Sequence, residues 1–213
     1  MLIRRGSPEG RVKAGRPVGA DPAEVLAFWF SERDATGAIR FNAEWFAANP
    51  AFDAEVHRRF AALHERAAAG TLAHWSDTWT GLRALIIVLD QFSRQLYRQS
   101  PKAFACDPLA RQLAQKACNH PDFGRLSALE QLFVLLPFEH SESLADQDFC
   151  VEQMANWATD PGLAVLLEHA EQHRELIRRF GRFPARNAVL GRMDTPDELA
   201  FRTAKSSETG KPS

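Results

Sequence analysis

The sequence predicts an all-α fold in a single domain, and three observations lead to this prediction. Helix-start signals recur along the chain, because Asp-Pro, Asn-Pro or a capping box opens most of the apolar segments. Apolar residues recur at spacings of three and four, whereas the alternation typical of a half-buried strand is absent. Val and Ile are sparse relative to Ala and Leu, which disfavours strands. Short connections between the segments predict stacked antiparallel helix pairs.

The N-terminal half contains three predicted helices. Asp21 and Asn49 each precede a proline, so each can cap a helix that begins at that proline. The second helix carries an apolar stripe at residues 52, 56, 60, 63 and 67, and Gly70 is expected to end it. A shorter segment lies around residues 44–46. The third helix is expected over about residues 80–97.

The C-terminal half contains five further predicted helices. One begins at Asp107 and extends to about residue 119. The next opens with a capping box at Ser127. It is expected to end at Pro137, because proline is unfavourable in the interior of a helix. Asp146 is expected to cap a helix that extends to about residue 157. The last two follow Asp160 and Thr195 and extend to about residues 181 and 204.

The two ends of the chain differ from the middle. Residues 1–20 carry five basic residues against one acid, and we expect them to form a disordered basic arm. Residues 205–213 are polar and are expected to form a disordered tail. The predicted organisation is therefore an arm, one helical domain over residues 21–204 and a tail.

Composition and motifs exclude several function classes. The net charge of −1 argues against a protein that binds nucleic acid through a general basic field. We expect no membrane helix, because no run of about 18 apolar residues occurs, and the N-terminus lacks the apolar stretch of a secretory signal. Three cysteines without a CxxC pair indicate free thiols in the cytoplasm. No nucleotide, zinc or nucleophile motif occurs, so we expect no metal or cofactor, and the oligomeric state stays open.

Charged side chains cluster on the helix expected over residues 80–97. At about 100° per residue, Arg83, Asp90, Arg94 and Tyr97 lie in one narrow wedge, and Arg98 follows directly after it. Arginines held by an aspartate can bind a carboxylate or a phosphate. The alternative is an ordinary Asp90–Arg94 ion pair at a solvated edge, which contributes only about 0.2–0.5 kcal/mol.

A second polar stretch follows Pro137. Its sequence, Glu139-His140-Ser141-Glu142, can supply acid–base groups or metal ligands. The spacing matches neither an HExxH motif nor a four-carboxylate set. A structural turn with capping acids is therefore the stronger interpretation of these residues.

The third polar stretch joins the end of the long helix to a rigid Gly-Arg-Phe-Pro turn. His173 is in line with the apolar stripe of this helix, so we expect an inward-facing, hydrogen-bonded core residue rather than a ligand. His169 lies at the edge of the stripe, and no third metal ligand is evident. Arg182 and Arg186 in the turn can bind an anion, or can equally fasten the loop to helix C-termini.

Together the three stretches resemble the bacterial domain of unknown function 924 family. The phrases LDQFSRQLYR, LPFEHSE and FGRFPARN carry this resemblance, which covers roughly residues 21–202. It implies an all-α, tetratricopeptide-like superhelix of stacked helix pairs and no established activity. The positions that match the family pattern, without an assigned role, are Asp90, Gln91, Arg94, Arg98, Glu139, His140, His173, Arg182, Phe183, Arg186 and Asn187.

Two positions depart from the family pattern. Ala185 stands where the family usually has a histidine, so any role that depends on that histidine is in doubt here. Trp79 stands where a proline usually precedes the central helix, which removes a favourable first-turn residue. Thr78 or Asp77 can still cap this helix.

These residues support three hypotheses. The favoured one is a helical binding module for a small anionic ligand or a peptide, with a site lined by Arg83, Asp90, Arg94, Arg98, Arg182, Arg186 and Asn187. The second is an enzyme in which Glu139, His140 and His173 provide acid–base chemistry in one cavity. It is less favoured because no catalytic motif occurs. In the third, the buried polar residues only pin helix ends and the turn.

Overall fold

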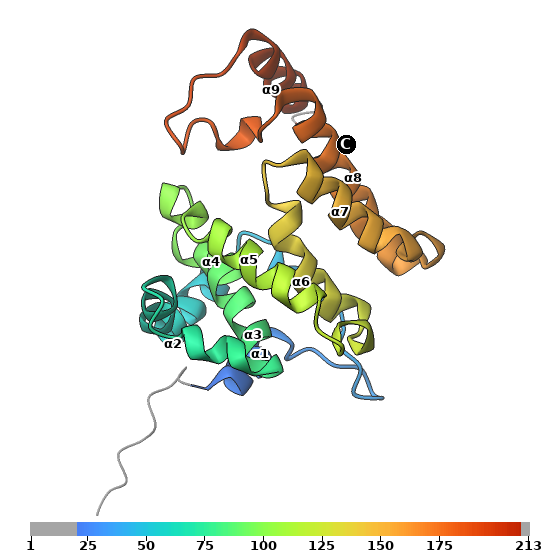
Figure 1. The fold of residues 1–213 in the computed structure, drawn as a ribbon. Coiled ribbons are helices and arrows are strands. Elements are labelled where there is room, and N and C mark those ends of the chain that lie inside the picture. The colour runs from blue at the N-terminus through green and yellow to red at the C-terminus, as the bar shows by residue number, and fades with distance from the viewer. Residues whose placement is uncertain (1–20, 210–213) are drawn as a thin grey trace, which may run out of the picture.

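Helices make up the regular structure of the computed structural model, which describes residues 21–209, with side chains as far as residue 204 (Figure 1). Within these residues the extended pairing is limited to an isolated bridge between Arg33 and Ile39. The predicted all-α, single-domain fold is therefore confirmed.

The N-terminal helices begin where the sequence predicts. Asp21 caps α1 (Pro22–Trp29) and Asn49 caps α2 (Pro50–Ala68), each through a side-chain oxygen that accepts from backbone N–H groups. Thr78 caps α3 (Trp79–Ile86) in the same way, so the missing proline leaves the helix start intact. Two 3-10 turns lie between these helices at Ala43–Trp45 (η1) and Ala73–Asp77 (η2).

The helix expected over residues 80–97 is not a regular α-helix. α3 continues into a π-helical segment, η3 (Ile87–Phe92), and then into α4 (Ser93–Leu96). A π turn changes the angular position of the residues that follow it, because its hydrogen bonds span five residues instead of four. Such turns occur often at functional sites, and this one carries Asp90.

The remaining elements follow in the predicted order. The α-helices are α5 (Asp107–Cys118), α6 (Ala128–Glu139), α7 (Leu144–Met154), α8 (Pro161–Phe180) and α9 (Pro196–Thr209). The 3-10 turns are η4 (Pro101–Phe104), η5 (Phe123–Arg125), η6 (Ala155–Thr159) and η7 (Pro184–Arg186).

The predicted end of α6 at Pro137 is wrong. The helix passes through this proline to Glu139, and all residues from Leu132 to Glu139 are buried. A proline inside a helix removes one hydrogen bond and costs about 3 kcal/mol. Burial of the whole final segment offsets this cost, and it places Glu139 on the helix and not in a turn.

Two other boundaries also differ from the prediction. Asp146 does not cap α7, which begins at Leu144 after Ser143. Its carboxylate instead pairs with Arg111 on α5, since a tertiary partner is available. α9 extends to Thr209, beyond the predicted end at residue 204. The expectations for residues 1–20 and 210–213 lie outside the described residues.

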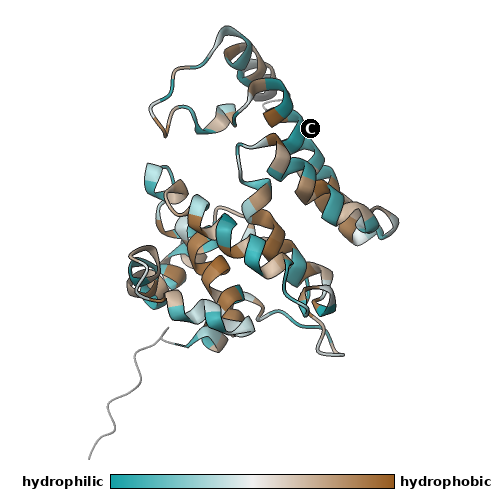
Figure 2. Ribbon diagram, viewed as in Figure 1, coloured by the Kyte–Doolittle hydropathy of each residue, from teal (hydrophilic) through white to brown (hydrophobic). Residues whose placement is uncertain are grey.

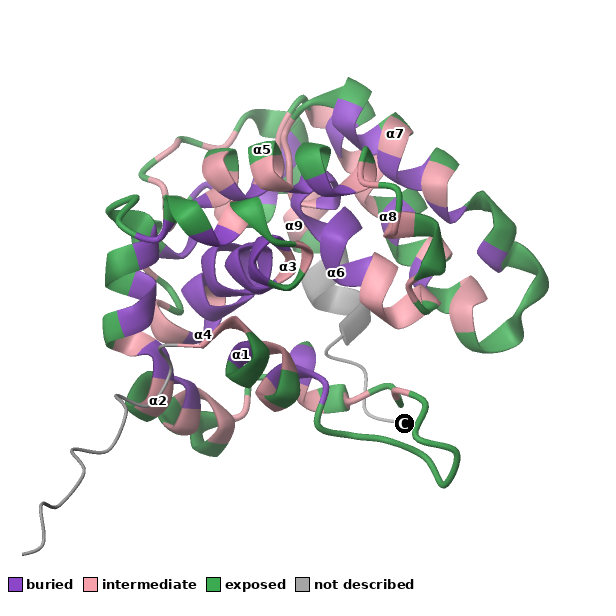
Figure 3. Cartoon of the chain, turned by 60° about the horizontal axis from the view of Figure 1, so that its bottom comes forward, coloured by how far each residue is buried: buried purple, intermediate pink, exposed green. Residues whose placement is uncertain are grey.

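α6 lies between two groups of helices. α5 packs against both α3 and α6 on one side, whereas α7 and α8 pack against α6 and against each other on the other side (Figure 1). α3 and α6 carry the most hydrophobic interior surface (Figure 2) and are mostly buried (Figure 3). The polar C-terminal end of α6 can therefore contact both groups.

Phe and Trp side chains, of which the sequence has fifteen and five, form much of the hydrophobic core. The Phe133 ring on α6 packs edge-on at 4.7 Å from Trp45 and 5.3 Å from Trp29, centroid to centroid. Trp45 Nε1 also donates a hydrogen bond to the carbonyl of Trp29. This cluster holds the loop between α1 and α2 against α6, and so positions one wall of the site.

Candidate functional site

Two cavities share the C-terminal end of α6. The histidine pocket has a volume of about 470 Å³, and its polar end is formed by Glu139, His140, His169 and His173. The arginine pocket has a volume of about 440 Å³, and its charged lining comprises Asp107, Arg111, His140, Glu142, Asp146 and Arg186. Both volumes fall within the range of about 300–1,000 Å³ typical of small-molecule sites. His140 lines both pockets.

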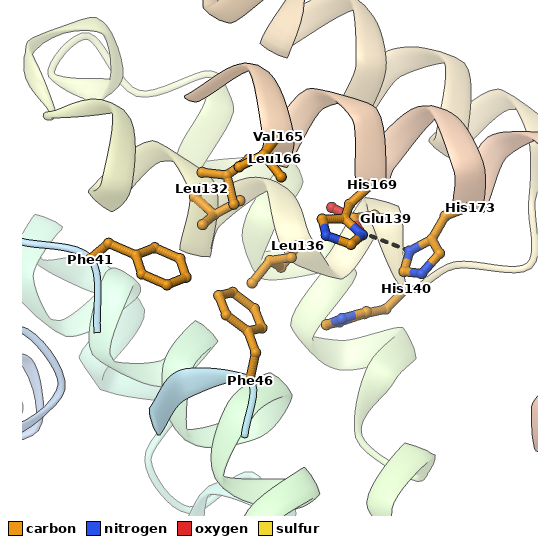
Figure 4. A pocket seen from close by; sticks show the side chains of 10 residues that line it. All are labelled: Phe41, Phe46, Leu132, Leu136, Glu139, His140, Val165, Leu166, His169 and His173. Atoms are coloured by element: carbon orange, nitrogen blue, oxygen red, sulfur yellow. Dashed lines mark ion pairs between the residues drawn. The ribbon is translucent and has the colours of Figure 1, made fainter. Parts of the chain in front are cut away.

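Helical spacing builds two walls of the histidine pocket. On α6, Leu132, Leu136 and His140 follow one another at intervals of four residues and so share one face. On α8, His169 and His173 are also four residues apart, and their rings converge on the end of α6 (Figure 4). Each helix thus presents an apolar turn followed by a polar turn.

The apolar end of this pocket is closed by a loop. Phe41 and Phe46 flank η1 and stack on each other at 5.9 Å, yet each is about half exposed. Val165 on α8 is also exposed and lines the same end. Exposed aromatic and aliphatic side chains around a concave surface are typical of a binding site for an apolar group.

The Asp90–His140 pair is the best-defined polar feature of the site. His140 Nδ1 lies 2.8 Å from Asp90 Oδ1, and Gln91 Nε2 donates to Asp90 Oδ2 at 2.6 Å. Asp90 is fully buried on η3. An ionised carboxylate can only accept, so His140 Nδ1 carries a proton and donates it. The other ring nitrogen, Nε2, makes no hydrogen bond with a described residue. It therefore remains available to a ligand in the pockets that His140 lines.

Asp90 is held in its ionised form by its neighbours. Burial alone would raise the pKa of this carboxyl, but His140 and Arg94 outweigh burial and lower the pKa to about 2. Arg94 Nη1 lies 3.4 Å from Asp90 Oδ1. At neutral pH, a buried carboxylate therefore fixes the orientation of the imidazole, as in other acid–histidine pairs.

Glu139 and His173 form a second carboxylate–histidine pair in the same pocket. Glu139 Oε1 lies 2.8 Å from His173 Nδ1, although the two groups lack the alignment of a regular hydrogen bond (Figure 4). The side chain of His173 is 37% exposed. The expected core histidine is thus wrong: His173 faces a cavity and packs edge-on against Phe183.

Gln147 fixes the helix end that carries both pairs. Its Nε2 donates at 2.7 Å to the carbonyls of Glu139 and Ser141, and this glutamine is fully buried on α7. Carbonyls at a helix C-terminus need such partners, because the helix leaves them unsatisfied. Gln147 was not identified from the sequence. Its polar side chain on the inner face of α7 was the available signal.

An arginine network connects the first polar stretch to the third. Arg94 makes two hydrogen bonds to Asp107, at 3.1 and 3.2 Å, and Arg186 Nη1 lies 3.9 Å from the same carboxylate. Burial raises the pKa of Asp107, while Arg94 opposes this shift. Through this shared acid, Arg186 of the Gly-Arg-Phe-Pro turn lies beside the N-terminal end of α5.

Glu142 joins the second polar stretch to the third. Its carboxylate accepts two hydrogen bonds from Arg192, at 2.6 and 2.9 Å, and a third from the backbone N–H of Phe183 at 2.9 Å. These bonds pin the turn after α8 to the turn after α6. The three polar stretches are therefore brought together around His140, Asp107 and Glu142.

Other predicted ligand residues lie outside both pockets. Arg83 pairs with Glu130, Arg98 with Asp53, and Arg182 with Glu198. Asn187 is fully buried and donates to Asp194 while it accepts from Arg192. Among the described residues these contacts fasten loops and helix ends, as the architectural hypothesis expects.

The predicted wedge forms only in part: Arg94 Nη1 lies 3.4 Å from Asp90 Oδ1, whereas Arg83 pairs with Glu130. Arg83 and Arg94 pair with different acids on different helices, Glu130 and Asp107. The π turn between them is the physical reason, because it breaks the 100° periodicity that the prediction assumed. The alternative of a solvated i,i+4 pair is wrong, since Asp90 is fully buried.

Several residues of the site were not identified from the sequence. Phe41, Phe46 and Arg111 contribute through tertiary packing, and no local pattern places them near α6. Ala185, which replaces the usual family histidine, is exposed and lines neither pocket. Within residues 21–204 no group of three or more His, Cys, Asp or Glu side chains is arranged to hold a metal ion.

Comparison with known proteins places the chain in a family. Residues 25–205 match the family described as bacterial protein of unknown function, DUF924. The chain belongs to this family. A solved structure, that of the protein of unknown function ATU0120 from Agrobacterium tumefaciens, is 34% identical; the match covers 84% of this chain and 95% of that chain, with a TM-score of 0.74. No curated protein matches the sequence.

The resemblance predicted from the sequence is thereby confirmed, and the DUF924 description adds no activity. Among the described helices of this DUF924 protein, none combines the length and the apolar character needed to cross a membrane.

Proposed function

We propose that the protein binds a small, largely apolar molecule in the histidine pocket, with the polar group of that molecule on His140 Nε2. The observation that carries this proposal is the buried Asp90–His140 pair, which fixes one ring nitrogen and leaves the other for the cavity. The apolar lining accounts for the body of the ligand, and the histidine end accounts for its polar group.

The tautomer of His140 determines the chemistry of the bound group. In the neutral ring Nδ1 carries the proton, so Nε2 is an acceptor and binds an O–H or N–H donor. In the protonated ring Nε2 becomes a donor and binds an anion instead. A hydroxyl, amine or acid on an apolar body therefore fits this site, with Glu139 and His173 beside it.

A second candidate function is acid–base catalysis in the same pocket. What supports it is that Glu139, His140 and His173 line one cavity, the convergence that the enzyme hypothesis requires. A histidine oriented by a buried carboxylate is a common general base. His140 would take the proton, with Asp90 stabilising the imidazolium.

The other expectations from the sequence are kept as proposals. Of the arginines expected to line a site for a small anion or peptide, Arg186 lines the arginine pocket, which supports that part of the expectation. The three cysteines are free thiols, which supports the proposed cytoplasmic location. The packing of neighbouring helices supports the proposed tetratricopeptide-like arrangement.

Fluorescence of N-phenyl-1-naphthylamine tests the binding proposal, because this neutral dye combines an apolar body with one N–H donor. Saturable binding is expected for the wild type. Val165→Lys should weaken it by at least about tenfold, equal to about 1.4 kcal/mol, since a charge then stands in the apolar wall. Leu199→Lys is the matched control, because Leu199 is exposed on α9 and lines neither pocket. Equal binding by both variants would contradict the proposal.

Acylation by diethyl pyrocarbonate tests the catalytic candidate. His140 should react faster than the exposed His57 on α2, and bound dye should slow His140 but not His57. Mass spectrometry of the modified peptides distinguishes the two sites. An unreactive His140 in a sample with modified His57 argues against a general base.

A further inference from the structure

Arg186 is held in an unusual environment. Its guanidinium carbon lies 4.8 Å from the ring centre of Phe104 and 4.4 Å from that of Phe183. Its guanidinium donates no hydrogen bond to any described residue, and its nearest acid, Asp107, is 3.9 Å away. The side chain is only 15% exposed. A largely buried cation with unused donors is costly unless another group satisfies it.

The neighbouring arginines lack this property. Arg94 makes two hydrogen bonds to Asp107, Arg192 makes two to Glu142, and Arg111 makes one to Asp146. The three carboxylates that line the arginine pocket are thus each already engaged by a guanidinium. Arg186 is the member of this set whose hydrogen-bonding capacity is unused.

The contacts of Arg186 with Phe104 and Phe183 leave its N–H groups available. The two phenyl rings lie close to its guanidinium carbon and accept no hydrogen bond from it, so the five N–H donors remain for other partners. Burial lowers the pKa of Arg186 to about 10, and the group therefore stays protonated at neutral pH. The pocket beside it also contains Arg111, whose terminal Nη groups donate no hydrogen bond within the described chain.

We propose that the arginine pocket is a second binding site, in which Arg186, assisted by Arg111, binds the carboxylate or phosphate group of a small molecule. A planar guanidinium edge matches two oxygens of either group. A volume of about 440 Å³ leaves room for the rest of a metabolite-sized ligand. His140 lines both cavities, but the binding groups proposed here are Arg186 and Arg111 and not His140, so either proposal can fail alone.

The three acids of the arginine pocket do not turn it into a cation-binding site. Glu142 accepts three hydrogen bonds and Asp107 accepts two, all from protein donors. Asp146 accepts from Arg111 and from the hydroxyl of Ser141. A bound cation would have to displace these donors, whereas an oxyanion would meet donors that are unused.

Calorimetric titration with inorganic phosphate and, separately, with succinate tests the proposal at constant ionic strength. Wild type should bind at least one of them, and the stronger binder identifies the preferred oxyanion. Arg186→Gln should weaken binding by at least about tenfold, and Arg111→Gln by less. Arg98→Gln is the matched control, because Arg98 pairs with Asp53 outside the pocket, and it should change affinity by less than about twofold.

Protection from phenylglyoxal provides a readout that needs no variant. In the wild type, phosphate or succinate should slow modification of Arg186, measured by mass spectrometry, and leave modification of the exposed Arg58 unchanged. Absence of binding by both anions would overturn the proposal. The proposal would also be overturned if the Arg186 and Arg98 variants weakened binding equally, or if the anions protected Arg58 and Arg186 alike. Either result would show general ionic binding to the protein surface.

Discussion

The two carboxylate–histidine pairs at the end of α6 involve consecutive residues but differ in burial and geometry. His140 turns towards η3 and is fixed by fully buried Asp90, whereas Glu139 turns towards α8 and meets the partly exposed His173. In the first pair the acid is locked and orients the base. In the second pair the acid is also buried, but its histidine is 37% exposed and the contact lacks the alignment of a regular hydrogen bond. One helix end thus supplies the same cavity with a histidine in a fixed orientation and with a less constrained carboxylate–histidine contact. Mutations in the two pairs should therefore differ in their effects on stability.

Asp90→Asn should have the largest effect on stability. It removes the buried charge that faces Arg94 and His140, so that Arg94 keeps only Asp107, and removing one partner of a buried pair typically costs about 3–5 kcal/mol. Urea unfolding measures this loss. Glu139→Gln is the matched change in the second pair and should cost about 1 kcal/mol or less, because His173 retains contact with solvent. Equal losses for the two variants would remove the distinction between the pairs.

The contribution of Asp90 should disappear in acid. Its pKa is lowered from 3.8 to about 2, so the folded state favours the ionised form. The resulting stability is complete above pH 4 and is lost as the pH falls from there towards 2, with a total of about 2 kcal/mol. The difference in unfolding free energy between wild type and Asp90→Asn should narrow over this range. A difference that stays constant with pH would show that the carboxylate charge contributes nothing.

Gln147→Ala should loosen both pairs together. It removes the donors that hold the carbonyls of Glu139 and Ser141, which corresponds to a loss of about 1–2 kcal/mol. Amide exchange at the end of α6 should accelerate with this loss. Gln172→Ala on the exposed face of α8 is the control and should be nearly neutral. If exchange at the end of α6 is the same in both variants, Gln147 does not position the site.

His173→Gln should have the smallest effect on stability, below about 1 kcal/mol, since the side chain is 37% exposed. It should nevertheless weaken dye binding in the histidine pocket. Thermal unfolding and dye titration on the same sample check both expectations. A large loss of stability with unchanged binding would return His173 to the role of a core residue.

Local sequence signals predicted the helices well because their causes are local. Caps at Asp21, Asn49 and Ser127 and the αL-forming Gly181 act within one turn, so the helix starts and the end of α8 followed from them. Asp146 was misassigned because a distant Arg111 outcompeted the local cap. The same reason explains the extension of α6 through Pro137, where burial decided the outcome.

The site was only partly predictable for a similar reason. His140, Glu139 and His173 were identified as candidates from their polar character in apolar helices, and the structure brings them to one cavity. Their partners were not predictable, since Asp90 reaches His140 across 50 residues of sequence and a π turn sets its direction. For the arginines the local pattern was misleading. Arg83 and Arg94 share a face in an ideal helix, but in the structure they pair with different acids.

Nitrogen NMR of the His140 ring identifies which of its two nitrogens carries the proton. We predict that the neutral ring is protonated at Nδ1, bonded to Asp90, and that N-phenyl-1-naphthylamine shifts the Nε2 resonance on binding. A neutral ring protonated at Nε2, or an Nε2 resonance that bound dye leaves unchanged, would contradict this prediction.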